Sequence, residues 1–354
     1  MRVLTSLPQD DLRKAAAAAQ AAEAAGYDGA LTMENKNDPF LAHAIAAVCT
    51  ERLPLGTSVA IAFPRNPVQL AHQAYDLQLL SKGRFTLGLG TQVRAQVERR
   101  YGAQFERPIA RMRDLVAALR AIFAAWETGE QLDFRGEFTS HTLIPPMFNP
   151  GPNPFGPPPI ALGGLGPQMV RLAAEVADGL LVMPFNTARH FAERTVAAID
   201  EGLARAGRAP SDLTVTGEVI VCCGRSDREL EAARVAGRWL LAFYASTPAY
   251  RPVLEVEGWA DLQPELNALS KAGRWDEMPG LIDDTVLTTI AAVGSPKEVA
   301  ADVNARFGDR ADRVGIYTPY LVGEDTLGEL VGELRDAVAG TGPARTEPVK
   351  EVPR

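Results

Sequence analysis

The chain has 354 residues, with 36 lysines and arginines against 44 aspartates and glutamates, so its formal net charge is −8. An acidic chain without a Lys/Arg-rich stretch is poorly suited to nucleic-acid phosphates, so no nucleic-acid partner is expected. Since no run approaches the roughly 18 apolar residues of a membrane span and no signal peptide is evident, we expect a cytoplasmic protein that does not enter a membrane. The few cysteines and scattered histidines lack disulfide or metal-ligand spacing, so no metal site is expected.

Short apolar runs alternate with Ala-rich amphipathic stretches along most of the chain. The runs predict buried strands, and the stretches predict helices that often begin with proline. The predicted strands are 2–6, 29–33, 55–63, 84–89, 160–163, 179–183, 213–222 and 314–318, and the predicted helices are 10–25, 38–50, 67–80, 108–126, 167–177, 188–206 and 327–338.

Continuously apolar strands that alternate with helices are typical of an α/β fold with a parallel sheet covered on both faces. A (β/α)8 TIM barrel fits this order best, although a doubly wound open sheet also satisfies the alternation. If the sheet closes into a barrel, functional residues are expected on the loops that follow the strands.

Two segments interrupt the alternation. Residues 128–159, after the fourth strand, contain several prolines that exclude a helix or a central strand, and they predict an ordered Pro-rich insertion. Residues 224–311, between the seventh and eighth strands, predict a mainly helical insertion. The interpretation is a single barrel domain over residues 1–340, followed by a disordered tail over 341–354.

One glycine-rich loop could bind phosphate. It comprises Gly163, Gly164, Leu165, Gly166 and Pro167, follows a strand and opens a helix, where backbone N–H groups attract an anion. A Rossmann fingerprint would need a third glycine where Met169 stands, so a nicotinamide-binding Rossmann domain is disfavoured.

Other motifs carry weaker signals. The segment around Ser58 approaches the GxSxG pattern of hydrolases, but its last glycine is Ala60 and an apolar strand follows, so a hydrolase is disfavoured. His43 and His72 lie in predicted helices and are interpreted as structural. His141 and His190 lie on or near the expected active face and remain candidates for proton transfer.

Several segments taken together resemble the luciferase-like flavin/F420 oxidoreductase superfamily. The matching stretches include Asp38-Pro39-Phe40, Gly56-Thr57-Ser58-Val59, Arg65-Asn66-Pro67, Leu80-Ser81-Lys82-Gly83-Arg84-Phe85-Thr86-Leu87-Gly88-Leu89-Gly90 and Leu165-Gly166-Pro167. The resemblance implies a TIM barrel that binds coenzyme F420, or alternatively FMN, across the barrel mouth. It also implies a homodimer.

The resemblance further implies roles for individual residues. Ser58-Val59 matches a non-proline cis peptide behind the cofactor ring, in a cofactor loop that includes Thr57. Glu34 matches an acidic position after the second strand, and Thr91 matches a loop hydroxyl beside the cofactor. The loop from Gly163 through Gly164, Leu165 and Gly166 to Pro167 matches the phosphate loop.

The chain departs from the sugar-phosphate dehydrogenase branch, because Asn35 and Val93 stand where that branch has its catalytic histidine and glutamate. We therefore expect an F420-dependent oxidoreductase that acts on a different small organic substrate. The candidates for handling the accompanying proton are Glu34, Tyr101, His141 and His190. An FMN-dependent monooxygenase and a non-catalytic flavin- or F420-binding protein remain alternatives.

Overall fold

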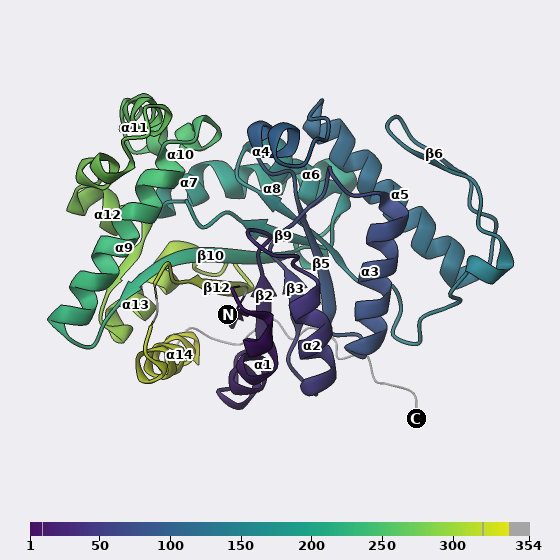
Figure 1. The fold of residues 1–354 in the computed structure, drawn as a ribbon, viewed down its shortest axis with the longest axis horizontal. Helices are drawn as coiled ribbons and strands as arrows, with labels where there is room; N and C mark the ends of the chain where they lie inside the picture. Colours follow the sequence, from purple (N-terminus) through teal and green to yellow (C-terminus); the bar gives the residue numbers. More distant parts are fainter. Residues whose placement is uncertain (9, 321, 340–354) are drawn as a thin grey trace.

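The computed structural model describes residues 1–8, 10–320 and 322–339, and within them eight parallel strands close into a barrel (Figure 1). The last barrel strand pairs back with the first, with Arg313 opposite Arg2, so the predicted (β/α)8 barrel is confirmed and the open sheet is excluded. In spatial order the barrel strands are β1 (Arg2–Ser6), β2 (Gly29–Thr32), β3 (Leu55–Thr57), β5 (Phe85–Gly90), β8 (Ile160–Gly164), β9 (Gly179–Val182), β10 (Thr214–Cys223) and β12 (Arg313–Tyr317). Two short strands extend the barrel: β4 (Ala60–Ile61) pairs with β5, and β11 (Ala292–Gly294) pairs with β10.

Helices cover the outside of the barrel. They are α1 (Ala15–Ala24), α2 (Leu41–Cys49), α3 (Pro67–Leu80), α4 (Arg94–Arg99), α5 (Pro108–Thr128), α6 (Pro167–Val176), α7 (Ala188–His190), α8 (Ala197–Ala206), α13 (Pro296–Phe307) and α14 (Glu324–Ala339). In the part of the chain that the structure describes, no helix combines the length and the hydropathy that a bilayer crossing requires.

The two insertions lie on opposite sides of the barrel (Figure 1). The Pro-rich segment contains a small antiparallel hairpin of β6 (Phe134–Arg135) and β7 (Ser140–His141) next to α5, which the sequence did not predict. The second segment contains α9 (Asp227–Ala245), α10 (Arg251–Val256), α11 (Leu262–Lys271) and α12 (Asp284–Ile290), as predicted, but β11 and α13 also fall within its expected bounds. The predicted tail at 341–354 lies outside the described residues.

Glycines of β5 leave room for the chain that follows β3. A Cβ at Gly88 would lie 1.8 Å from the carbonyl oxygen of Thr57, and one at Gly90 would lie 2.4 Å from Cγ2 of Val59. The Thr57 hydroxyl also donates to the Gly88 carbonyl over 2.6 Å and accepts from the Gly88 N–H over 2.9 Å. Residues 57–59 are therefore held against β5 at the carboxyl end of the strands, where this fold carries its functional sites.

Replacing Gly88 with alanine is expected to lower the free energy of unfolding by about 1–3 kcal/mol, because the added methyl group would collide with the backbone of Thr57. Gly328 in α14 offers a matched control, since a Cβ there would meet no heavy atom within 4 Å. Gly328→Ala is expected to raise stability by up to about 1 kcal/mol. Urea unfolding followed by circular dichroism measures both changes, and a Gly88→Ala protein as stable as the wild type would contradict the close contact.

Candidate functional site

A buried carboxylate organises one side of the barrel mouth. Glu34, which follows β2, is 8% exposed. Its Oε2 accepts from the Ile61 N–H over 2.7 Å and from Arg65 Nη1 over 2.6 Å, and its Oε1 accepts from the Tyr101 hydroxyl over 2.9 Å. Arg65 also donates to the Ile61 carbonyl over 2.7 Å. The structure thus brings Glu34 and Tyr101, two of the predicted proton-handling residues, into direct contact.

The environment of Tyr101 favours its neutral form. Burial raises the pKa of its phenol, and the hydrogen bond to Glu34 acts in the same direction because the ionised phenol would face a carboxylate. Tyr101 therefore carries a proton at neutral pH and presents that proton to Glu34. Arg65 supplies the positive charge next to the carboxylate, and Asp38 lies 3.6 Å from the other guanidinium nitrogen.

The Ser58–Val59 peptide bond is cis, as predicted. The backbone on either side of it is tied to β2, since Ser58 N–H donates to the Thr32 carbonyl over 2.6 Å and Glu34 N–H donates to the Val59 carbonyl over 3.2 Å. The Val59 side chain lies between Gly90 and Gly163, whose missing Cβ atoms would come within 2.4 and 3.0 Å of it. The predicted cofactor loop and Glu34 therefore form one connected unit.

The predicted phosphate loop lies at the end of β8 and the start of α6. Gly163 and Gly164 end the strand, Leu165 links it to the helix, and Gly166 precedes Pro167 at the first helical position. A Cβ at Gly166 would meet no heavy atom within 4 Å, so the backbone is open to approach there. Thr91 follows β5 and is partly exposed, whereas the hydroxyl of Thr57 is engaged by Gly88.

The two candidate histidines lie elsewhere. His141 belongs to the β6–β7 hairpin, where it stacks on Phe134 beside α5, because the Pro-rich insertion runs along the outside of the barrel. His190 ends α7 and is buried, with Nδ1 2.8 Å from Oδ1 of Asn186, and burial lowers the pKa of its imidazole to about 4. The structure does not bring either histidine to the group formed by Glu34, Arg65 and Tyr101 (the Glu34 cluster), and their catalytic roles stay predictions.

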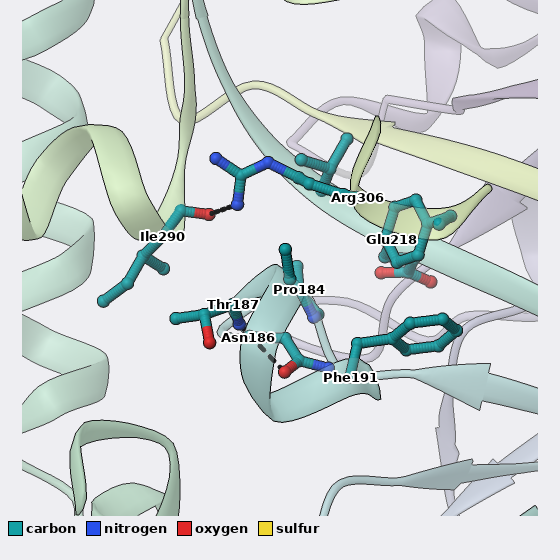
Figure 2. A pocket seen from close by; sticks show the side chains of 10 residues that line it. Pro184, Asn186, Thr187, Phe191, Glu218, Ile290 and Arg306 are labelled. Atoms are coloured by element: carbon teal, nitrogen blue, oxygen red, sulfur yellow. Dashed lines mark hydrogen bonds between the residues drawn. The ribbon is translucent and has the colours of Figure 1, made fainter. Parts of the chain in front are cut away.

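Figure 2 shows a small pocket between β10 and the helices α7 and α13. Several of its polar groups are hydrogen-bonded: Arg306 donates to the Ile290 carbonyl over 3.0 Å, Asn186 Oδ1 accepts from the Thr187 N–H over 2.9 Å, and Glu218 accepts from the Ser58 hydroxyl. We interpret it as a packing feature. A wider surface groove of about 550 Å³ lies beside Glu34 and is lined by Arg65, Tyr101 and residues of α3.

Two residues of the mouth were not assigned from the sequence. Arg65 lay in a matching stretch, but nothing in the pattern indicated that it pairs with Glu34. Glu218 lies in β10, is 8% exposed, and accepts a hydrogen bond from the Ser58 hydroxyl. A signal was available, because Glu218 is a charged residue inside an otherwise apolar predicted strand.

The profile of the luciferase-like monooxygenase family matches residues 2–313. The chain belongs to this family. An uncharacterized protein of Mycobacterium tuberculosis is 48% identical over 309 residues, covering 87% of this chain and 91% of that protein. The 5,10-methylenetetrahydromethanopterin reductase of Methanolobus tindarius is 28% identical, covering 84% and 88%. The structure of the coenzyme F420 dependent tetrahydromethanopterin reductase of Methanopyrus kandleri aligns with a TM-score of 0.79 at 20% identity, covering 96% of this chain and 99% of that chain.

Membership of this family makes the chain similar to flavin- and F420-dependent oxidoreductases, and structures with either kind of cofactor share its fold. The predicted superfamily is thereby confirmed. The family alone leaves both cofactors open.

The charge pairing at Glu34 predicts strong coupling between two substitutions. Arg65→Met leaves a carboxylate that is 6% exposed without its cation, so the free energy of unfolding should fall by about 2–4 kcal/mol. Adding Glu34→Gln removes the uncompensated charge and should recover part of that loss. Breaking the exposed Arg94–Glu98 pair with Arg94→Met, the matched control, should cost less than about 0.5 kcal/mol. Additive effects of Arg65→Met and Glu34→Gln in urea unfolding would contradict the pairing.

Proposed function

We propose that the protein is an F420-dependent oxidoreductase that transfers hydride between the deazaflavin C5 and a small organic substrate. The observation that carries the proposal is the Ser58–Val59 segment at the barrel mouth, which we call the cofactor seat. Val59 lies between two glycines, with the Glu34–Tyr101 pair on one side and the open first turn of α6 on the other. The reductases among the relatives, one of them named as F420 dependent, support this cofactor.

The residues present fit such a cofactor. A phosphate can approach the backbone at Gly166, where no side chain intervenes and the helix N-terminus attracts an anion. The ring would be held by Ser58 and Val59, with Thr57 fixing that segment and Thr91 at its edge. The phosphate would be held by the loop from Gly163 through Gly164 and Leu165 to Gly166 and Pro167.

The chain's own contribution is placement and proton handling. When bound, F420 supplies the carbon that gives or takes hydride. Tyr101 holds a proton at its hydroxyl oxygen, Glu34 accepts the hydrogen bond that orients this hydroxyl, and Arg65 balances the charge of Glu34. We propose Tyr101 as the proton donor, because it combines a retained proton with a place on the groove beside the mouth.

A homodimer belongs to the proposal through the family resemblance. Neighbouring helices α2 and α3 expose Leu41, Val48, Leu79 and Leu80, which are apolar side chains available to such an interface.

Cofactor choice is tested by anaerobic titration of the purified protein with F420 and, separately, with FMN, following cofactor fluorescence. Saturable F420 binding at lower concentration than FMN is expected. Tighter FMN binding would transfer the protein to the monooxygenases that give the family its name. Binding without turnover of any enone, imine or alcohol would favour the non-catalytic alternative, and binding of neither cofactor would overturn the proposal.

Tyr101→Phe removes the proposed proton but keeps the ring. With a substrate identified, kcat is expected to fall by about 100-fold or more, while the Kd of the cofactor stays within about twofold. Tyr27→Phe is the matched control, because Tyr27 lies just before β2, at the opposite end of the barrel, and its hydroxyl bonds to Thr5. Full turnover by Tyr101→Phe would remove Tyr101 from the mechanism and return the role to Glu34, His141 or His190.

A further inference from the structure

Glu218 is a buried carboxyl group that the proposed chemistry leaves without a role. Its side chain points into the barrel: a Cβ at Gly315 of the neighbouring strand β12 would lie 3.0 Å from Cγ of Glu218. The Ser58 hydroxyl donates to its Oε1 from the far side of the barrel, across 160 residues of sequence. Since β3 and β10 are not neighbours in the sheet, this hydrogen bond crosses the barrel interior directly below the cofactor loop.

The groups that face Glu218 do not neutralise a negative charge. Tyr317 on β12 and Tyr244 on α9 share a hydrogen bond, and burial raises the pKa of both phenols, so both stay neutral. Arg306 on α13 lines the same pocket as Glu218 (Figure 2), but its guanidinium is held by Asp302 at 2.8 Å and by backbone carbonyls that include that of Ile290. Burial therefore raises the pKa of Glu218 to about 7, and the hydrogen bond from Ser58 opposes this rise only partly.

We propose that Glu218 is a positioning residue that acts through the Ser58 hydroxyl and makes the cofactor seat sensitive to proton uptake. The inference rests on the proposed cofactor binding. A ring that settles on Ser58 and Val59 lies against the residue whose hydroxyl donates to Glu218, and it excludes water from that side of the carboxyl group. Covering an ionised carboxylate costs far more free energy than covering a neutral carboxyl group, so binding favours protonated Glu218.

The sign of the pH dependence follows from this linkage. Binding that favours the protonated form takes up a proton, so the affinity of the wild type falls as pH rises through the pKa of about 7. Glu218→Gln keeps a neutral side chain that can still accept from Ser58, so its affinity lacks this component. Dividing the Kd of the wild type by that of Glu218→Gln cancels any titration of the cofactor itself.

The test is a fluorescence titration of F420, and of FMN in parallel, from pH 5.5 to 8.5. The ratio of wild-type to Glu218→Gln Kd is expected to stay near one at pH 5.5 and to reach about ten at pH 8.5. This is the effect expected if cofactor binding raises the pKa of Glu218 by about one further unit. Thr216→Val is the matched control, because Thr216 lies on the same strand one interior position below, is buried, and lines the other end of the barrel. It should follow the wild-type profile.

Ser58→Ala provides an independent variant if Glu218→Gln does not fold. The hydrogen bond from Ser58 lowers the pKa of Glu218. Without it, the pH at which the affinity for the cofactor begins to fall should be higher than in the wild type. A flat Kd ratio across this range, or an unmoved inflection in Ser58→Ala, would overturn the role of Glu218 while leaving the proposed function intact. Failure of the wild type to bind either cofactor at any pH would instead overturn the proposed function, and this inference with it.

Discussion

The barrel mouth depends on the close contact between residues 57–59 and the glycines of β5 and β8. Gly88 accommodates the Thr57 carbonyl and Gly90 the Val59 side chain, at separations that no Cβ would permit, and Gly163 leaves Val59 room on its other side. This contact splits the third apolar run into β3 and β4 and turns the intervening segment into the barrel mouth. A continuous third strand would remove the segment between β3 and β4 on which, in the proposed function, the cofactor ring rests.

One of the sequence stretches on which the family resemblance rests contains a residue that stabilises the fold. Arg84, from the stretch Leu80 to Gly90, donates to the carbonyls of Ala47, Thr50 and Leu53 over 3.1, 2.9 and 2.5 Å. These carbonyls end α2 and lead into β3, so one guanidinium satisfies groups that the helix end leaves unbonded. Because it joins the starts of β3 and β5, it fixes their relative placement below the mouth, where residues 57–59 must meet the glycines.

The sequence predicted the barrel because its strands are continuous apolar runs and its helices have clear proline and glycine boundaries. It did not predict α4 or the β6–β7 hairpin, since both are short and their sequences have no apolar period. The break at Ser58–Val59 came from the family resemblance, because periodicity alone treats 55–63 as one strand. His141 was expected near the active face, but the direction in which a Pro-rich insertion leaves the barrel is set by packing on α5.

The same division holds for the site: single residues could be predicted from the sequence, but their contacts could not. Glu34 and Tyr101 could each be named from their loops, but their contact, and the pairing of Arg65 with Glu34, depend on side-chain directions that a linear pattern does not contain. The link from Ser58 to Glu218 was harder still, because it joins strands on opposite sides of a closed barrel. Only closure of the sheet and the registers of the intervening strands bring these residues together.

Two carboxyl groups therefore flank the Ser58–Val59 segment, at the same exposed fraction of 8% but with different partners. Glu34 receives a guanidinium, a backbone N–H and a phenol, whereas one hydroxyl donates to Glu218. Depth of burial cannot distinguish their chemistry, so the supply of donors and positive charge must. The guanidinium and the N–H that bind Glu34 fix its orientation toward Tyr101, whereas burial with a single hydroxyl donor raises the pKa of Glu218. In the proposed complex a ring over this segment removes water from the Ser58 side of Glu218, where the proton is taken up, while Glu34 orients the hydroxyl of Tyr101.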